Sequence, residues 1–306
     1  MSNFKYFIRL FVFWLLYFFV NRLFFIVNYL EEFLQFSSTE LLLIVKKSVR
    51  LDISFIAYLS VMITILLFFN SIILRKRFNA FISGLVYWIN SLFIFVSALI
   101  IGGEISIYAE WGTKLNFTAL SHFANPSEVF STSTYANYFT MLIAIFIAVV
   151  FVKIYTVFVH QFFISNRYNY KQFVVKIIKL PIVLGMFLLL IRGGWKEIPI
   201  NLSDAYFSNN IILNDVTVNP NWNLIQNILK NKSNFKGNPY KKHPQERVDK
   251  IIESIKKESD STTYVLNTDQ PNIVFILLES WSADNIESLG GLKGITPIFK
   301  ALEKEG

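Results

Sequence analysis

A single carboxylate follows the most apolar short segment in the last third of the chain. Residues 273–278 read Ile-Val-Phe-Ile-Leu-Leu, and Glu279 comes directly after them. An uninterrupted apolar and β-branched run of this length is typical of a strand buried on both faces of a parallel sheet. Ligands bind beyond the carboxyl ends of such strands, so Glu279 is placed to hold a divalent metal ion or a polar substrate. The alternative is a carboxylate that caps a neighbouring helix or is solvated, and position alone favours neither.

Hydroxyl groups near Glu279 include no convincing nucleophile. Thr296 precedes Pro297 and an amphipathic segment, a pattern that predicts an N-cap at Thr296 and proline at the first helical position. Ser280 and Ser282 adjoin Glu279, but no residue near them in the sequence could act as a base. The chain therefore supplies one metal ligand and no catalytic nucleophile, and we expect it to be inert by itself.

A second set of charged residues interrupts or borders long apolar runs. Arg22 lies inside the first run, where an unpaired charge costs several kcal/mol. Asp52 lies at a compatible depth at the start of the second run, so we predict an Arg22–Asp52 ion pair in preference to a contact with lipid phosphate. At the predicted outer interface, a head-group site or an interfacial belt could be formed by Glu104, Glu110, Trp111, Lys114 and Arg192. The candidate lipid-binding residues are therefore Arg22, Arg50, Asp52, Glu104, Glu110, Lys114 and Arg192.

The elements that position these residues follow from the composition. Of 306 residues, 54% are hydrophobic and only 16% are charged, whereas a soluble globular chain carries about 25% charged residues. Cysteine is absent, which excludes disulfides and thiolate metal sites. Lys and Arg outnumber Asp and Glu by 16 to 7 in residues 1–195, and the counts are 13 and 14 in the remainder. The excess of basic residues lies between apolar runs, where it orients membrane helices, so nucleic acid is not an expected partner.

Five stretches are long enough to cross a bilayer, which takes roughly 20 mostly apolar residues. The predicted spans are 8–29, 53–74, 81–102, 138–160 and 173–191. Basic residues gather before the first span, at 75–77 and around 167–179, whereas the 103–137 connection is acidic. The positive-inside rule therefore predicts a cytoplasmic N-terminus and places everything after residue 191 outside the cytoplasm.

The predicted fold is an α-helical membrane domain with five transmembrane helices, followed by the incomplete start of an α/β domain. Residues 1–191 form the membrane domain and residues 192–270 an extracytoplasmic juxtamembrane segment, a linker at 229–243 and a short amphipathic helix at 244–258. Residues 271–306 form the first strand–loop–helix of the α/β domain. The amphipathic helix is predicted because Val248, Ile251, Ile252 and Ile255 fall at helical spacing.

Two parts of the sequence resemble one enzyme family. The segments PNIVFILLESW (271–281), SLGG (288–291) and GITPIF (294–299) resemble the start of the catalytic domain in lipoteichoic acid synthase-like sulfatases, within the alkaline phosphatase/sulfatase superfamily. In the membrane half, VRLDIS (49–54), EISIYAEWGTKLN (104–116) and the RGG at 192–194 are similar to its span boundaries. The chain departs from the family pattern at Ile298, where Asn is usual, and at Lys114, where Arg is commoner.

The resemblance implies an enzyme of the bacterial cytoplasmic membrane. It would transfer phosphoglycerol or a similar phospho-alcohol from a phosphatidylglycerol-like lipid to an extracytoplasmic glycan or lipid acceptor. The resemblance further implies Mn²⁺ or Mg²⁺ bound by Glu279 together with later residues, and a threonine nucleophile beyond residue 306. Two alternatives stay open: a membrane-anchored sulfate or phosphate ester hydrolase, and a non-catalytic membrane or lipid-binding module.

Overall fold

The computed structural model describes residues 2–72, 76–122, 125–162, 170–231, 244–256, 270–279 and 281–305. The chain divides into two compact units, Met1–Tyr240 and Lys241–Gly306. Ser280, which adjoins the predicted metal ligand, and most of the predicted linker at 229–243 lie outside the described residues.

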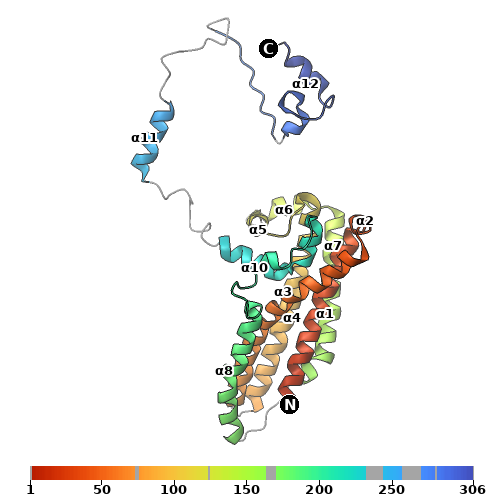
Figure 1. Cartoon of the computed structure of the whole chain (residues 1–306), viewed down its shortest axis with the longest axis vertical. Helices are drawn as coiled ribbons and strands as arrows, with labels where there is room; N and C mark the ends of the chain where they lie inside the picture. Colours follow the sequence, from red (N-terminus) through yellow and green to blue (C-terminus); the bar gives the residue numbers. More distant parts are fainter. Residues whose placement is uncertain are drawn as a thin grey trace. The chain divides into compact units, whose positions relative to one another are not determined.

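Unit 1 is built on five long helices that run side by side (Figure 1). Within the described ranges, four stretches are long and apolar enough to cross a membrane, which supports the prediction of a helical multi-pass membrane domain: Phe4–Asn28, Ser38–Asn70, Arg77–Trp111 and Tyr135–Phe162. The fifth predicted span lies in a 23-residue helix, α8, which is not among these four stretches, so this span stays a prediction. The helices are α1 Ser2–Asn28, α3 Ser38–Ile72, α4 Lys76–Trp111, α7 Tyr135–Phe158 and α8 Tyr170–Arg192.

The long helices extend well past the spans predicted from hydropathy. α3 has 35 residues and α4 has 36, so each is more than about 50 Å long at 1.5 Å per residue. A hydrocarbon core is about 30 Å thick. Backbone hydrogen bonds and packing determine where a helix ends, whereas the thickness of the bilayer limits only the length of its apolar part. Both helices can therefore project beyond the lipid.

Short helices cover the end of the bundle that lies away from the N-terminus (Figure 1). Within this cover, α9 packs on α1 and α3, and α10 packs on α3, α4 and α5. The elements are α2 Leu30–Phe33, α5 Phe117–Ser121, α6 Pro126–Thr132, the 3-10 turn Leu202–Asp204, α9 Ile211–Thr217 and α10 Pro220–Asn231. For residues 192–228 the sequence predicted only a juxtamembrane segment, whereas in the structure α9 and α10 are part of the packing of the bundle.

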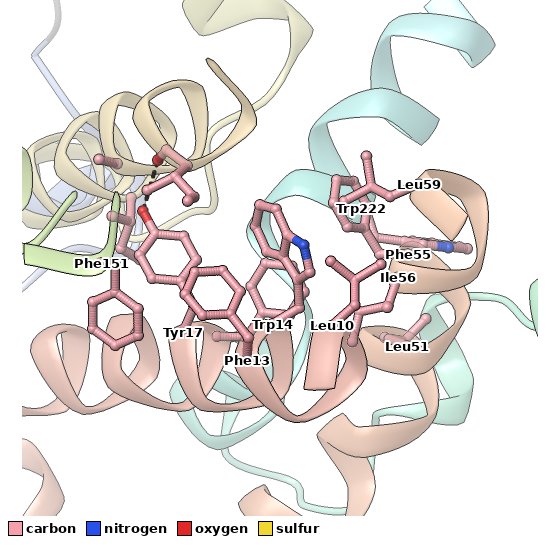
Figure 2. Close-up of a cluster of buried hydrophobic side chains, with 14 of the residues drawn as sticks. Leu10, Phe13, Trp14, Tyr17, Leu51, Phe55, Ile56, Leu59, Phe151 and Trp222 are labelled. Carbon is pink, nitrogen blue, oxygen red and sulfur yellow. Dashed lines mark hydrogen bonds between the residues drawn. The ribbon is translucent and has the colours of Figure 1, made fainter. Parts of the chain in front are cut away.

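Aromatic side chains of α1 form the centre of the core (Figure 2). Trp14 is fully buried, and its indole N–H donates to the Asn90 Oδ1 of α4 at 3.2 Å. The Tyr17 hydroxyl donates to the Ile94 carbonyl at 2.7 Å. These bonds satisfy the polar ends of two buried rings, as a low-dielectric interior requires, and they set the register of α1 against α4.

Unit 2 confirms the predicted helix and differs at the predicted strand. α11 spans Gln245–Lys256 and α12 spans Pro297–Leu302. Residues 271–278 are not in a strand; their apolar side chains are exposed, Phe275 by 85%. A strand needs a hydrogen-bonded neighbour, and the described residues contain no strand to pair with. The α/β domain is therefore not formed by the described part of this unit.

The start of α12 confirms one detail and corrects another. Pro297 is the first helical residue and Thr296 occupies the N-cap position, as predicted. The Thr296 hydroxyl, however, does not cap the helix. It donates to the Asn285 carbonyl at 2.6 Å and so ties the loop to the helix start.

Candidate functional site

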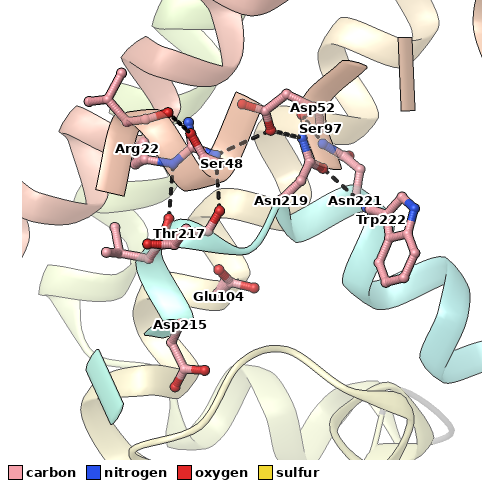
Figure 3. Close-up of polar contacts among 12 residues, drawn as sticks. Arg22, Ser48, Asp52, Ser97, Glu104, Asp215, Thr217, Asn219, Asn221 and Trp222 are labelled. Atoms are coloured by element: carbon pink, nitrogen blue, oxygen red, sulfur yellow. Dashed lines mark hydrogen bonds and ion pairs between the residues drawn. The ribbon is translucent and has the colours of Figure 1, made fainter. Parts of the chain in front are cut away.

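The predicted ion pair between Arg22 and Asp52 is present in the structure (Figure 3). Arg22 Nη2 lies 3.2 Å from Asp52 Oδ1, and the residues are only 6% and 2% exposed. Arg22 comes from the last third of α1 and Asp52 from the second quarter of α3. The two charges therefore compensate each other inside the bundle, so neither is buried without a counter-ion.

The end of α9 completes the binding of Arg22. Arg22 Nε donates to the Val216 carbonyl at 2.9 Å, and Nη2 also lies 3.4 Å from the Thr217 carbonyl. Carbonyls in the last turn of a helix have no partner within that helix and carry a partial negative charge. The guanidinium thus satisfies carbonyls that the end of α9 would otherwise bury unpaired.

Asn219 joins the same network from the turn between α9 and α10. Its side-chain amide donates to Asp52 Oδ1 at 2.8 Å, and its Oδ1 accepts from the backbone N–H of Trp222 at 3.1 Å. The second bond is an N-cap interaction for α10, which begins at Pro220. One fully buried asparagine therefore connects the ion pair to the start of a helix.

A second buried ion pair lies on α4 and the loop after it. Lys114 Nζ lies 2.5 Å from Glu104 Oε1 and donates to the Asp215 carbonyl at 3.0 Å. The Tyr108 hydroxyl donates to Asp215 Oδ2 at 3.2 Å. This cluster holds the two carboxyl groups of Glu104 and Asp215 and one ammonium group, so its formal charge is negative when both are ionised.

Asp215 is the carboxylic acid of this cluster that lies outside the long helices, on α9. Burial raises the pKa of the Asp215 carboxyl above its ordinary value, and the Lys114 ammonium and the Tyr108 hydroxyl lower it in part. Desolvation favours the neutral acid because a carboxylate loses its hydration when buried. Docking of α9 is therefore linked to the protonation of Asp215.

The other predicted residues lie in different surroundings. Arg50 forms an ion pair with Asp204 and donates through Nη2 to the Gly193 carbonyl at 2.8 Å. Glu110 is exposed near the end of α4, and Arg192 is exposed at the end of α8. The structure therefore brings together Arg22 with Asp52 and Glu104 with Lys114, and leaves Arg50, Glu110 and Arg192 outside both networks. A role for these residues in lipid binding stays a prediction.

Glu279, the predicted metal ligand, is exposed in unit 2. Among the described residues, no group of three or more His, Cys, Asp or Glu side chains could hold a metal ion. A carboxylate by itself does not make a divalent-metal site, which needs several oxygen ligands. The described residues therefore do not form the site that the family resemblance implies.

Several residues that hold the segment 211–223 against the bundle were not among those predicted from the sequence: Tyr108, Asp215, Asn219, Asn221 and Asn223. Asn221 donates to the Ser97 hydroxyl at 2.8 Å, and Asn223 donates to the Leu115 carbonyl at 3.1 Å. The sequence did contain an indication of this segment, because every second residue from 219 to 223 is asparagine: Asn219, Asn221 and Asn223. Amides at this density are unusual for a solvated loop that merely follows a membrane span, but their partners are distant in sequence.

Comparisons of the chain with protein-family models, curated proteins and solved structures find no match. The geometry of the two networks is therefore the guide to their role. Both are buried within unit 1, and both attach the segment 211–223 to the long helices. They explain how an Asn-rich segment is held at the end of a membrane bundle.

Proposed function

We propose that this chain carries the membrane domain and the opening of the catalytic domain of a lipoteichoic acid synthase-like enzyme. The enzyme transfers phosphoglycerol or a related phospho-alcohol from a membrane lipid to an extracytoplasmic acceptor. The observation that carries the proposal is the sequence 271–281, in which Glu279 directly follows six apolar residues and precedes Ser280 and Trp281. The four apolar helices of unit 1 are consistent with an enzyme that draws its substrate from a bilayer.

The proposal includes α8 as a fifth membrane span and an orientation with the N-terminus in the cytoplasm. α8 is 23 residues long, which is sufficient to cross the hydrocarbon core. With five crossings and a cytoplasmic N-terminus, unit 2 lies on the extracytoplasmic side, where lipid-linked acceptors are modified. The basic loop at 75–77 supports this orientation.

Within this proposal, Glu279 is one ligand of a divalent metal ion. Oxygen ligands suit Mg²⁺ or Mn²⁺, which would neutralise charge on phosphate oxygens. The described residues do not complete a metal site, so Glu279 by itself would not support a catalytic step.

The test uses the complete reading frame that contains these residues, expressed in bacterial membranes with a fluorescent phosphatidylglycerol donor. We expect release of labelled diacylglycerol that requires Mn²⁺ or Mg²⁺, and we expect Glu279→Ala to reduce it to background. Glu253→Ala, which removes an exposed carboxylate of α11, is the matched control and should retain activity. Full activity of Glu279→Ala would remove Glu279 from the metal site. Hydrolysis without transfer would favour the esterase alternative, and a reading frame that ends at residue 306 would favour the non-catalytic one.

A further inference from the structure

The chain leaves α8 through a loop that the structure holds at both ends. The Gly193 N–H donates to the Leu190 carbonyl at 3.1 Å, and the Gly194 N–H donates to the Leu189 carbonyl at 2.8 Å. With Gly193 at φ +83°, this pair of bonds is a Schellman motif that ends the helix. The Ile200 N–H then returns to the Arg192 carbonyl at 2.9 Å, which closes the loop.

The Arg192 side chain holds the loop by hydrogen bonds to two of its carbonyl groups. Its Nη2 donates to the carbonyls of Lys196 and Glu197 at 3.1 and 2.6 Å. A loop tied by a helix cap, a closing backbone bond and an arginine has little freedom to fold its tip back onto the protein.

The tip presents large apolar side chains to the surroundings. Trp195 is 87% exposed and Ile198 is 71% exposed. Tryptophan contributes one of the largest apolar surfaces of any side chain, so exposing it to water on a braced loop is costly. An exposed tryptophan of this kind is favourable where the surroundings offer apolar groups to the ring and hydrogen-bond acceptors to the indole N–H, as the head-group region of a bilayer does.

Trp195 follows the end of α8 by three residues, so it lies where that helix would leave the bilayer. Tryptophan and tyrosine are enriched where membrane helices meet the head-group region, because their rings are apolar and their N–H or O–H groups are polar. Trp195 occupies such a position at the end of α8.

We propose that the loop 193–198 is an interfacial anchor whose Trp195 and Ile198 side chains insert into the head-group region of the bilayer. The exposed apolar face of α8, including Ile182 and Met186, continues into this tip, so lipid contact along the helix extends to the loop. The basic residue Lys196 adjoins Trp195 and complements lipid phosphates. The inference rests on the proposed membrane span of α8, and it assigns the loop a ligand surface that the catalytic proposal does not use.

The test is site-directed spin labelling, because the chain contains no cysteine and one introduced cysteine is labelled uniquely. Trp195→Cys and Ile198→Cys probe the tip, Ile182→Cys probes the middle of α8, and Asn209→Cys is an exposed polar control in unit 1. In phosphatidylglycerol-containing proteoliposomes, collision of the label with a water-soluble nickel complex should be severalfold lower at positions 195 and 198 than at position 209. Collision with oxygen there should be intermediate between positions 182 and 209.

The outcomes separate the anchor from the span. A lipid-buried label at 182 with labels at 195 and 198 as water-accessible as the label at 209 would overturn the anchor and leave the span of α8 intact. Water-accessible labels at all four positions would overturn both. Dipolar broadening between labels at 195 would indicate contact with a second copy of the chain and would also overturn the lipid assignment. The Ile198→Cys variant retains Trp195, so loss of folding in one tip variant does not prevent the measurement.

Discussion

Arg22 of α1 and Asp52 of α3 form a buried ion pair, with Nη2 and Oδ1 3.2 Å apart. The pair also holds a third segment, because Arg22 binds the Val216 carbonyl and Asp52 binds the Asn219 amide. A contact between two long helices is thus also the attachment point of α9 and α10. The charges at this level link the helical bundle to the short helices that cover its end.

Removing one partner of this pair should be strongly destabilising. We expect Asp52→Asn to lower the free energy of unfolding by about 3–5 kcal/mol, because it leaves the Arg22 charge buried without a counter-ion. Arg22→Met should then cost less in the Asp52→Asn background than in the wild-type protein. Reversible unfolding in mixed micelles measures all four proteins of this cycle. Additive losses would show that the two charges are not coupled. Glu31→Gln, which changes an exposed carboxylate on α2, should alter stability by less than about 0.5 kcal/mol.

Stability should depend on pH through Asp215. Its pKa is raised in the folded state, so the folded protein binds the proton more tightly than the unfolded chain. Asp215 therefore contributes most to the free energy of unfolding below the pKa that it has in the unfolded chain, about 4. This contribution is lost as the pH rises through the pKa of the folded state. We expect Asp215→Asn to remove this loss, so that the difference in Tm between variant and wild type grows in favour of the variant as pH rises. Thermal scans across this pH range check it, and a difference that does not change with pH would contradict the linkage.

Two adjacent glycines at the end of α8 provide a matched test of the loop. A Cβ at Gly193 would lie 2.7 Å from the Ile200 Cβ, whereas a Cβ at Gly194 would have no atom within 4 Å. Both residues have positive φ, so both alanine variants carry backbone strain of about 1–3 kcal/mol. Gly193→Ala should lose more unfolding free energy than Gly194→Ala, because only it adds the clash. Equal losses in chemical denaturation would show that Ile200 moves away freely.

Topology can be tested with reporters in a bacterial host. A phosphatase fused after residue 260 should be active, because that enzyme folds only outside the cytoplasm, and one fused at residue 77 should be silent. The reverse pattern would overturn the orientation that the basic loops predict. Activity at neither site, with both fusions present at normal levels, would contradict an odd number of spans between the two positions.

The apolar runs by themselves determined the long helices and the depth of the charges within them. Because about 20 apolar residues define a span, the runs alone place Arg22 and Asp52 at one level, and the cost of an unpaired buried charge favours their pairing. The spacing of Val248, Ile251, Ile252 and Ile255 likewise predicted α11. These features depend on local periodicity and on burial cost, which the sequence contains directly.

Only the tertiary structure decided what surrounds that pair. Asn219 lies 167 residues from Asp52 along the chain, and neither its side chain nor that of Asp215 carries a periodic signal that predicts where it docks. Residues 273–278 show that a local pattern can also mislead. Their composition is that of a buried strand, yet their side chains are exposed. A strand is completed by hydrogen bonds to a neighbouring strand, whereas a helix makes its backbone hydrogen bonds within itself. Sequence therefore determined the long helices and α11, and contacts between distant segments determined how α9 and α10 dock and which residues form the polar networks.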